Sequence, residues 1–252
     1  DSDSSWAKID EYVKAELAKI KAGGKKIRIV SNTVNSPSTK AAIADFTAQY
    51  PTTKHIQVDA VSYTGIIKAN ENSFGKAVLP KYRFDRADLI VSFGADFLGT
   101  WISPVEFSRQ YTSKRNNTAL QGKKMSRHIQ FETGMSLTGT NADARLPLKP
   151  SEEGIALLNL YAALGGAVTG TKPLANNPNA EKAIALAAKE LAAAKGRALV
   201  ISGSNDVSTQ IVVNAINSIL GSYGTTIDLD NPSYQYAGND AEFAEFVNEM
   251  NR

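Results

Sequence analysis

Cysteine is absent from this chain of 252 residues, and histidine occurs only twice. Without cysteine there is no disulfide, no thiolate nucleophile and no Cys-ligated zinc or iron–sulfur site. His55 and His128 both fall within predicted strands, and neither has an Asp or Glu at metal-ligand spacing. We therefore predict no metal site and no cysteine-dependent chemistry.

Long apolar runs and a dense basic stripe are also lacking. No apolar run approaches the roughly 20 residues that cross a bilayer, so we predict no membrane span. The formal net charge is only +3, and we interpret the one basic cluster as a solvated loop. Nucleic-acid binding would require a denser basic surface with aromatic residues between the charges, so we expect no nucleic-acid partner. The cluster contains Lys114, Arg115, Lys123, Lys124 and Arg127.

The amino-terminal residues, DSDSSW, have neither the basic nor the apolar region of a secretion signal, and they lack an initiating Met. We expect either a processed protein or, as the interpretation we favour, an internal fragment of a longer protein. The hydrophobic fraction of 42% is enough to build a core. The length suits one large α/β domain or two small ones.

The stretch at 82–101 is the most informative part of the chain. Residues 87–93 form an apolar run that is too short for a helix and stops at Gly94, which is typical of a strand buried on both faces of a parallel sheet. Further strands are predicted at 26–31, 55–60, 126–131, 197–202 and 225–229. Helical spacing predicts helices between them and at both ends, at 5–22, 38–50, 64–70, 104–115, 151–164, 179–195, 207–220 and 240–251. The alternation predicts an α/β fold with a Rossmann-like, doubly wound, mostly parallel sheet and helices on both faces, a three-layer αβα arrangement.

Local signals place some helix starts and a possible domain boundary. Ser36 or Ser38 is expected to cap one helix, with Pro37 in its first turn, and Ser151 to cap another. Residues 137–150 are predicted to be irregular, with 146–150 extended. The Gly-, Thr-, Pro- and Asn-rich stretch 167–179 is predicted to be a linker. It would separate an α/β part at 1–166, which holds the central strand and a dinucleotide crevice, from a second α/β part at 180–252 that either completes the same sheet or begins a second subdomain.

Polar residues follow several of the predicted strands. In open α/β sheets ligands bind beyond the carboxyl ends of the strands. We predict that the strands 26–31, 87–93, 126–131 and 197–202 are parallel neighbours, so that four side chains open at one edge: Asn32, Asp96, Glu132 and Asn205.

Alternatives remain at each of these loops. The loops after 26–31 and 197–202 suit either phosphate binding on backbone N–H groups or plain turn and capping chemistry, and we favour the second because neither reads GxGxxG or GxxxxGK[ST]. Asp96 either faces a nucleotide base or sugar, or caps its own loop. The sequence 202–204, Ser-Gly-Ser, lacks the GxSxG order and a His partner, so we do not expect a hydrolase triad.

Three blocks resemble a known family. Residues 84–99, FDRADLIVSFGADFLG, resemble the strand and loop of molybdopterin oxidoreductase large subunits, and in particular the molybdopterin-oxidoreductase-like subunit of alternative complex III, a bacterial quinol-oxidising respiratory assembly. Residues 125–132 with 137–150, which end in ADARLPLKP, and residues 197–203 with 215–221 are similar to later blocks of that subunit. The order and spacing agree from about 27 to 251.

The chain departs from the catalytic members of the family at three loops. Those members read G-x-N-P, D-P-R and P-G-T-D where this chain has residues 94–97, 132–134 and 150–153. The resemblance therefore implies a fold kept without molybdenum, in which molybdopterin guanine dinucleotide has been lost and this chain holds no cofactor. Its cofactor-binding residues would be vestigial or weak: Gly94, Asp96, Glu132 and Gly134. Phe97 and Trp101 are expected to fill part of the same crevice.

The resemblance implies a structural or docking module in a respiratory electron-transfer complex, with no catalytic residues in the isolated chain. The implied partners are the other domains of the same subunit, including an iron–sulfur region, and the other subunits of a membrane-bound complex. The implied location is the periplasmic side of the inner membrane. Two alternatives stay open: part of a catalytic, dinucleotide-binding molybdopterin oxidoreductase, and a free-standing periplasmic nucleotide- or sugar-binding protein.

Overall fold

The computed structural model describes residues 4–116, 124–174 and 177–251. The chain forms two compact units. Unit 1 combines Asp1–Ser62 with Ala237–Arg252, and unit 2 is Tyr63–Tyr236. No helix within the described ranges is both long and apolar enough to cross a membrane.

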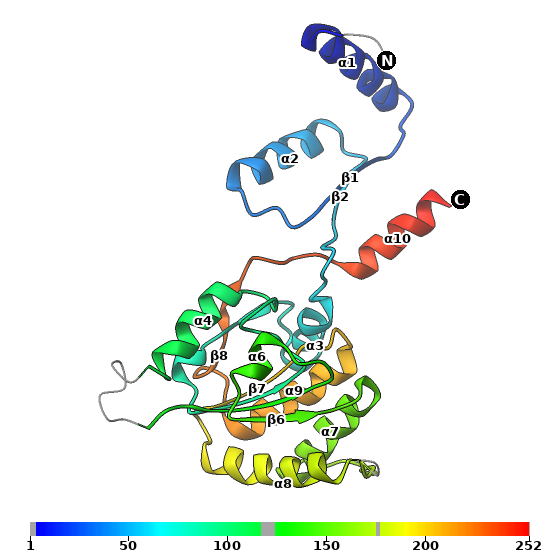
Figure 1. Ribbon diagram of the computed structural model, residues 1–252. Coiled ribbons are helices and arrows are strands. Elements are labelled where there is room, and N and C mark those ends of the chain that lie inside the picture. The colour runs from blue at the N-terminus through cyan, green and yellow to red at the C-terminus, as the bar shows by residue number, and fades with distance from the viewer. Residues whose placement is uncertain (1–3, 117–123, 175–176, 252) are drawn as a thin grey trace. The chain divides into compact units, whose positions relative to one another are not determined.

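Unit 2 is built on a parallel sheet of four strands in the order β6-β5-β4-β7 (Figure 1). The strands are β4 (Leu89–Phe93), β5 (Arg127–Glu132), β6 (Ala144–Pro147) and β7 (Ala198–Ser202). Leu89 of β4 lies opposite Arg127 on one side and Ala198 on the other. All five residues of β4 are buried, as the apolar run predicted for a strand covered on both faces.

Helices cover both faces of this sheet. One face packs on α7 (Pro150–Ala163), α8 (Pro178–Ala193) and α9 (Val207–Leu220), in a core that contains Val91 and Phe93. The opposite face packs on α4 (Pro104–Ser113) and the short turn η1 (Phe84–Arg86), in a second core that contains Ile90. In Figure 1, α4 lies above the sheet and α8 below it. The predicted three-layer αβα fold with a mostly parallel sheet is confirmed.

Two further elements complete unit 2. β3 (Leu79–Tyr82) and β8 (Ile227–Ser233) pair antiparallel in a small sheet, and α3 (Thr64–Phe74) packs on α9. No strand was predicted at 79–82, where β3 contains Pro80; a proline is tolerated in a short strand of a two-stranded sheet. Strands β5 and β7 lie before and after the stretch 167–179, and both pair with β4. The linker at 167–179 stays a prediction.

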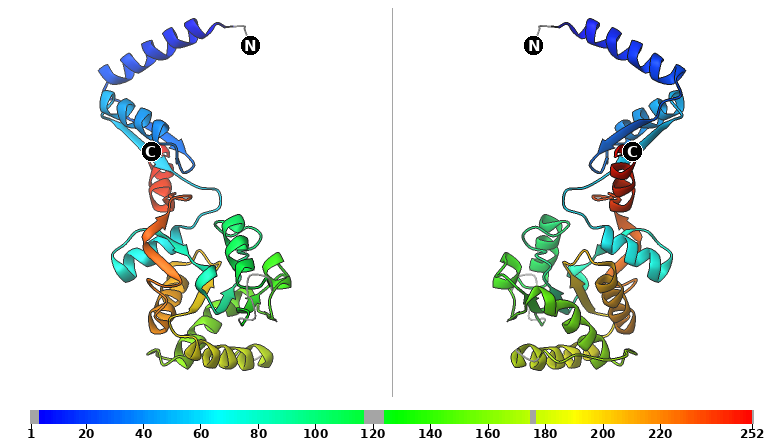
Figure 2. Two further views of the ribbon diagram at one scale, coloured as in Figure 1. Left: turned by 90° about the vertical axis from the view of Figure 1, so that its left-hand side faces the viewer. Right: turned by 90° about the vertical axis from the view of Figure 1, so that its right-hand side faces the viewer.

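Unit 1 contains a second parallel pair, β1 (Ile27–Ser31) and β2 (Thr53–Gln57). Its helices are α1 (Trp6–Ala22), α2 (Pro37–Gln49) and α10 (Asp240–Met250), and α2 lies beside the strand pair (Figure 2). The prediction that the strand ending at Ser31 neighbours β4 was therefore wrong. None of its residues is buried, so β1 lacks the two-sided cover that β4 has.

The helix starts test the predicted caps. The side chain of Ser36 accepts a hydrogen bond from the amide of Thr39, so Ser36 is the N-cap of α2 as predicted. Ser151 is not a cap: α7 begins at Pro150, whose missing N–H costs nothing at a first helical position. The prediction that 137–150 is irregular was wrong in part, because α6 (Leu137–Thr140) and β6 lie within it.

Candidate functional site

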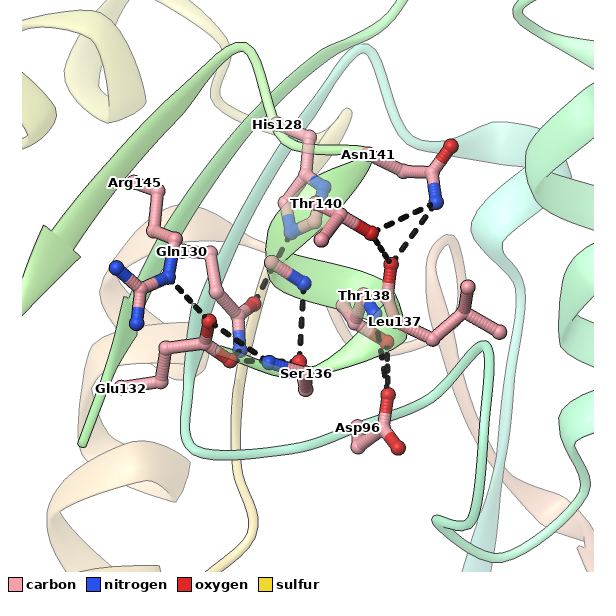
Figure 3. A network of polar contacts seen from close by, with 11 residues as sticks. Asp96, His128, Gln130, Glu132, Ser136, Leu137, Thr138, Thr140, Asn141 and Arg145 are labelled. Carbon is pink, nitrogen blue, oxygen red and sulfur yellow. Dashed lines mark hydrogen bonds and ion pairs between the residues drawn. The ribbon is translucent and has the colours of Figure 1, made fainter. Parts of the chain in front are cut away.

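A buried row of polar side chains runs along one face of β5 (Figure 3). His128, Gln130 and Glu132 are 0%, 0% and 5% exposed, whereas the alternate residues Ile129 and Phe131 belong to the apolar core on the other face. Nε2 of His128 lies 3.1 Å from Oε1 of Gln130, and Nε2 of Gln130 donates to Glu132 at 3.2 Å. The row ends at the carboxyl edge of the sheet, where the sequence placed the candidate site.

Glu132 has hydrogen-bond donors on both of its oxygens. Oε2 accepts from Oγ of Ser136 at 2.6 Å, and Oε1 accepts from Nε of Arg145 at 2.5 Å and from the amide of Ser136 at 3.2 Å. Burial by itself would raise the pKa of Glu132, but the donors on Ser136, Arg145 and Gln130 outweigh it and lower the pKa below the usual range. Glu132 is therefore a carboxylate whose charge is compensated by its own chain.

The start of α6 closes over this carboxylate. Oγ of Ser136, the N-cap of α6, accepts from the amide of Gly139 at 2.9 Å. A Cβ atom built on Gly139 would lie 1.9 Å from Oε1 of Glu132, so only a glycine backbone fits there. Ser136 and Gly139 together occupy the space in front of the acid.

Asp96 binds the same segment from the loop after β4. Its Oδ1 accepts from Oγ1 of Thr138 at 2.7 Å and from the amide of Thr138 at 3.1 Å (Figure 3). Oγ1 of Thr138 in turn accepts from the amide of Leu98 at 2.9 Å. A Cβ atom on Gly99 would lie 2.2 Å from Oδ2 of Asp96. These contacts join Asp96 to the start of α6, 42 residues further along the chain.

The two predicted glycines differ in their surroundings. Gly94 has a φ of +62°, a conformation that favours glycine, and it lies next to Glu153 of α7. Oε1 of Glu153 accepts from Oγ of Ser202 at 2.6 Å, and burial raises the pKa of Glu153 although this hydrogen bond opposes it. Gly134 is exposed, and a Cβ atom placed on it would have no other atom within 4 Å.

The other two strand-end residues lie elsewhere. Oδ1 of Asn205 accepts from the amide of Gly65 at 2.8 Å, so this side chain holds the start of α3. Asn32 belongs to unit 1. The structure thus joins Asp96 and Glu132 through the segment 136–139, places Gly94 beside Glu153, and leaves Gly134 apart.

Four contributors to this edge escaped the sequence analysis as site residues: Ser136, Thr138, Arg145 and Glu153. A serine followed by a short helical turn is an N-cap signal that marks Ser136. Arg145 and Thr138 meet their partners only through tertiary packing, at separations of 13 and 42 residues. No local sequence pattern predicts such pairings.

The two carboxylates at this edge are engaged by the chain itself. A guanine base needs acceptors for its N–H groups, yet Glu132 and Oδ1 of Asp96 already accept from the chain. Phe97 and Trp101, which are 0% and 5% exposed, belong to the core on the α4 face. The described residues also contain no group of three His, Cys, Asp or Glu side chains that could hold a metal ion.

Comparisons with known proteins bear on the fold. No family model matches the chain, and no curated protein matches it. Among solved structures it is similar to a chain of the formyltransferase/hydrolase complex from Methylorubrum extorquens, determined with methylofuran. That match has a TM-score of 0.56 and 14% identity, and covers 86% of this chain and 56% of the other.

Acetylene hydratase from Pelobacter acetylenicus is also similar, with a TM-score of 0.52, 14% identity, and coverage of 90% of this chain and 34% of the other. The chain thus spans about half and about a third of the lengths of these two proteins. At this identity the likenesses show the fold alone. They show a distant similarity in fold to these two proteins.

Proposed function

We propose that this chain is part of a molybdopterin-oxidoreductase-like subunit of a respiratory electron-transfer complex of the alternative complex III type. In this proposal it is a structural or docking module that works without bound molybdenum. The motif blocks at 84–99, 125–150 and 197–221 support the family, and the distant likeness in fold is compatible with it.

One observation carries the structural role. The segment 136–139 hydrogen-bonds to Glu132 through Ser136 and to Asp96 through Thr138, at the edge where ligands of open α/β sheets bind. A ligand that used either carboxylate would have to compete with these donors. Each buried polar group left without a partner costs about 1–3 kcal/mol, so the self-contained arrangement favours a scaffold over a working dinucleotide site.

A docking role is supported by α1. This helix has no buried residue, and it exposes Trp6 to 81% and Tyr12 to 67%, with Ile9 and Val13 also exposed. Aromatic side chains are enriched at protein interfaces. The proposed partners are the other domains of the same subunit, including an iron–sulfur region, and further subunits of a membrane-bound complex on the periplasmic side of the inner membrane.

Calorimetric titration with guanosine diphosphate at low salt tests the state of the carboxyl edge. We expect no binding tighter than about millimolar, near 4 kcal/mol of affinity, that depends on Asp96 or Glu132. Micromolar binding that is abolished by Asp96→Ala or Glu132→Ala would replace the structural role with the catalytic alternative. Pterin and molybdenum analysis of the full-length subunit gives an independent answer.

The docking role is tested separately by assembly of the complex. The double variant Trp6→Ser, Tyr12→Ser should reduce recovery of the full-length subunit in the assembled complex, measured by native electrophoresis. Val105→Ser is the matched control, because Val105 is 85% exposed but lies in unit 2. Equal recovery of all three proteins would argue against α1 as a docking element.

We further expect dye-linked reductase assays on the isolated chain to show no turnover.

A further inference from the structure

A cavity of about 800 Å³ opens at the amino edge of the four-stranded sheet, away from the strand ends of the candidate site. Leu89, the first residue of β4, and Arg127, the first of β5, line it, together with Arg197 just before β7. The last turn of α8 contributes Glu190 and Ala193. Such a volume falls in the range of small-molecule sites.

Backbone hydrogen bonds fix the cationic residues around this cavity. The amide of Asp88 donates to the carbonyl of Arg197 at 2.7 Å, and the amide of Arg127 donates to the carbonyl of Asp88 at 2.9 Å. The three residues therefore lie side by side across the start of three adjacent strands, with Asp88 in the middle. Since neighbouring strands lie about 4.8 Å apart, the two arginines start roughly 10 Å from each other, on either side of Asp88.

Positive charge is in excess among the lining residues. Four cations, Lys114, Lys124, Arg127 and Arg197, face two carboxylates, Asp88 and Glu190. Asp88 binds two of them: it accepts from Nζ of Lys114 at 2.9 Å and from Nε of Arg197 at 2.6 Å. Burial would raise the pKa of Asp88, but these two donors lower it, so its charge is retained.

The arginines keep donors for a ligand. Glu190 engages Arg127 through Nε, at 2.6 Å, and Asp88 likewise engages Arg197 through Nε. Within the described part of the chain, no hydrogen bond to the Nη atoms of either arginine, or to Nζ of Lys124, is found. A guanidinium with both Nη groups available is suited to the oxygens of a phosphate.

The same cavity has an apolar wall made of Leu89, Met125, Ala193 and Ala194. A phosphate ion alone would leave most of the volume unused. We propose that this cavity binds a phosphorylated small molecule, whose phosphoryl group is held between Arg127 and Arg197 with Lys124 and whose apolar part lies against the Leu89 side. The site is independent of the carboxyl edge and of the proposed docking role.

This proposal changes the interpretation of the basic cluster. Arg115 pairs with Asp143 outside the cavity, and Arg127 begins a strand, so the cluster is not simply a solvated loop. Lys123 lies outside the described residues.

Titration of the 252-residue chain with inorganic pyrophosphate and with phenyl phosphate, in EDTA and at low salt, tests the site. Amide chemical shifts observed by NMR should move at Leu89 and Ala194 and stay unchanged at Gly94 and Gly134. We expect saturable binding with a Kd at or below about 1 mM, tighter for phenyl phosphate because of the apolar wall. Higher salt should weaken it.

Charge-neutralising variants provide the control. Arg127→Gln should weaken binding about tenfold, the loss expected for one charge-assisted contact. Lys124→Gln should weaken it several-fold without removing any contact within the described chain. Lys182→Gln makes the same change of charge on α8 outside the cavity and should leave the Kd within about twofold. Absence of saturable binding, shifts confined to the carboxyl edge, or equal weakening by Lys182→Gln would each overturn the proposal.

Discussion

The backbone of Gly139 is in direct contact with the carboxylate of Glu132: a Cβ atom on residue 139 would lie 1.9 Å from Oε1. This oxygen cannot move aside freely, because Arg145 and Ser136 hold it. We therefore expect Gly139→Ala to lower the free energy of unfolding by about 1–3 kcal/mol, the usual cost of overpacking. Urea denaturation at pH 7 measures it.

Gly134→Ala is the matched control for this prediction. No atom lies within 4 Å of a Cβ at position 134, and the φ of Gly134 is not in the left-handed region. The change should stay within about 0.5 kcal/mol. Equal effects of the two variants would mean that the carboxylate is not held in place.

His128 makes stability depend on pH. Burial lowers the pKa of His128 to about 4, a shift that its contact with Gln130 opposes, whereas an unfolded histidine titrates near its ordinary value of 6.5. The unfolded chain therefore binds the proton first as the pH falls. The contribution of neutral His128 to the free energy of unfolding is complete above pH 6.5. It is lost between pH 6.5 and about 4, and the loss is at most about 3 kcal/mol.

The measurement is the free energy of unfolding against pH, for the wild type and for His128→Asn. The slope between pH 5 and 6.5 should disappear in the variant, whatever its overall stability. A slope that survives the substitution would have to come from another group.

The pH dependence of stability that comes from Glu153 has the opposite sign to that of His128. Burial raises the pKa of its carboxyl, so the folded state binds the proton more readily than the unfolded state. The associated stability is present at low pH and is lost as the pH rises through the folded pKa. Glu153→Gln, which keeps an acceptor for Ser202, should therefore raise Tm at pH 7 and give a smaller gain at pH 4. Calorimetric scans of the wild type and the variant at the two pH values test this prediction. A lower Tm of the variant at pH 7 would show that the charge of Glu153 stabilises the fold.

Asp59 ties together three segments of unit 1. It accepts from the amide and Oγ1 of Thr33, at 2.9 and 2.6 Å, and from the amide of Gly238 at 3.0 Å. Asp59→Ala should speed hydrogen exchange at the amides of Thr33 and Gly238 about tenfold or more, because all three charge-assisted hydrogen bonds to the carboxylate are lost. Asp45→Ala, an exposed acid on α2, should leave both rates unchanged.

The sequence was most informative where one physical constraint dominated. Residues 87–93 had to be a strand buried on two faces, because an apolar run of that length fits little else. The predicted helix 207–220 matches α9, since apolar spacing and a Gly221 terminus in the left-handed region agree there. β3 was missed because its proline contradicts a strand, and α6 because a helix of four residues has no periodicity.

For the candidate site, the sequence located the two acids but not their partners. Asp96 and Glu132 follow β4 and end β5, which a strand pattern reveals. That both bind the segment 136–139, through Thr138 and Ser136, depends on how α6 packs against β5. The pairing partner of β1 could not be predicted either, because hydrophobic periodicity identifies a strand but not its neighbours in the sheet.

The first and last residues of unit 2 are in contact: the rings of Tyr63 and Tyr236 pack edge to face, with their centroids 4.7 Å apart. A segment whose two ends meet in this way has the topology of an inserted domain, which can be removed or transplanted without stretching the host chain. Residues 63–236 should therefore fold when produced alone. The same closure makes Tyr63 and Tyr236 natural points at which to join the old ends in a circularly permuted version of this unit.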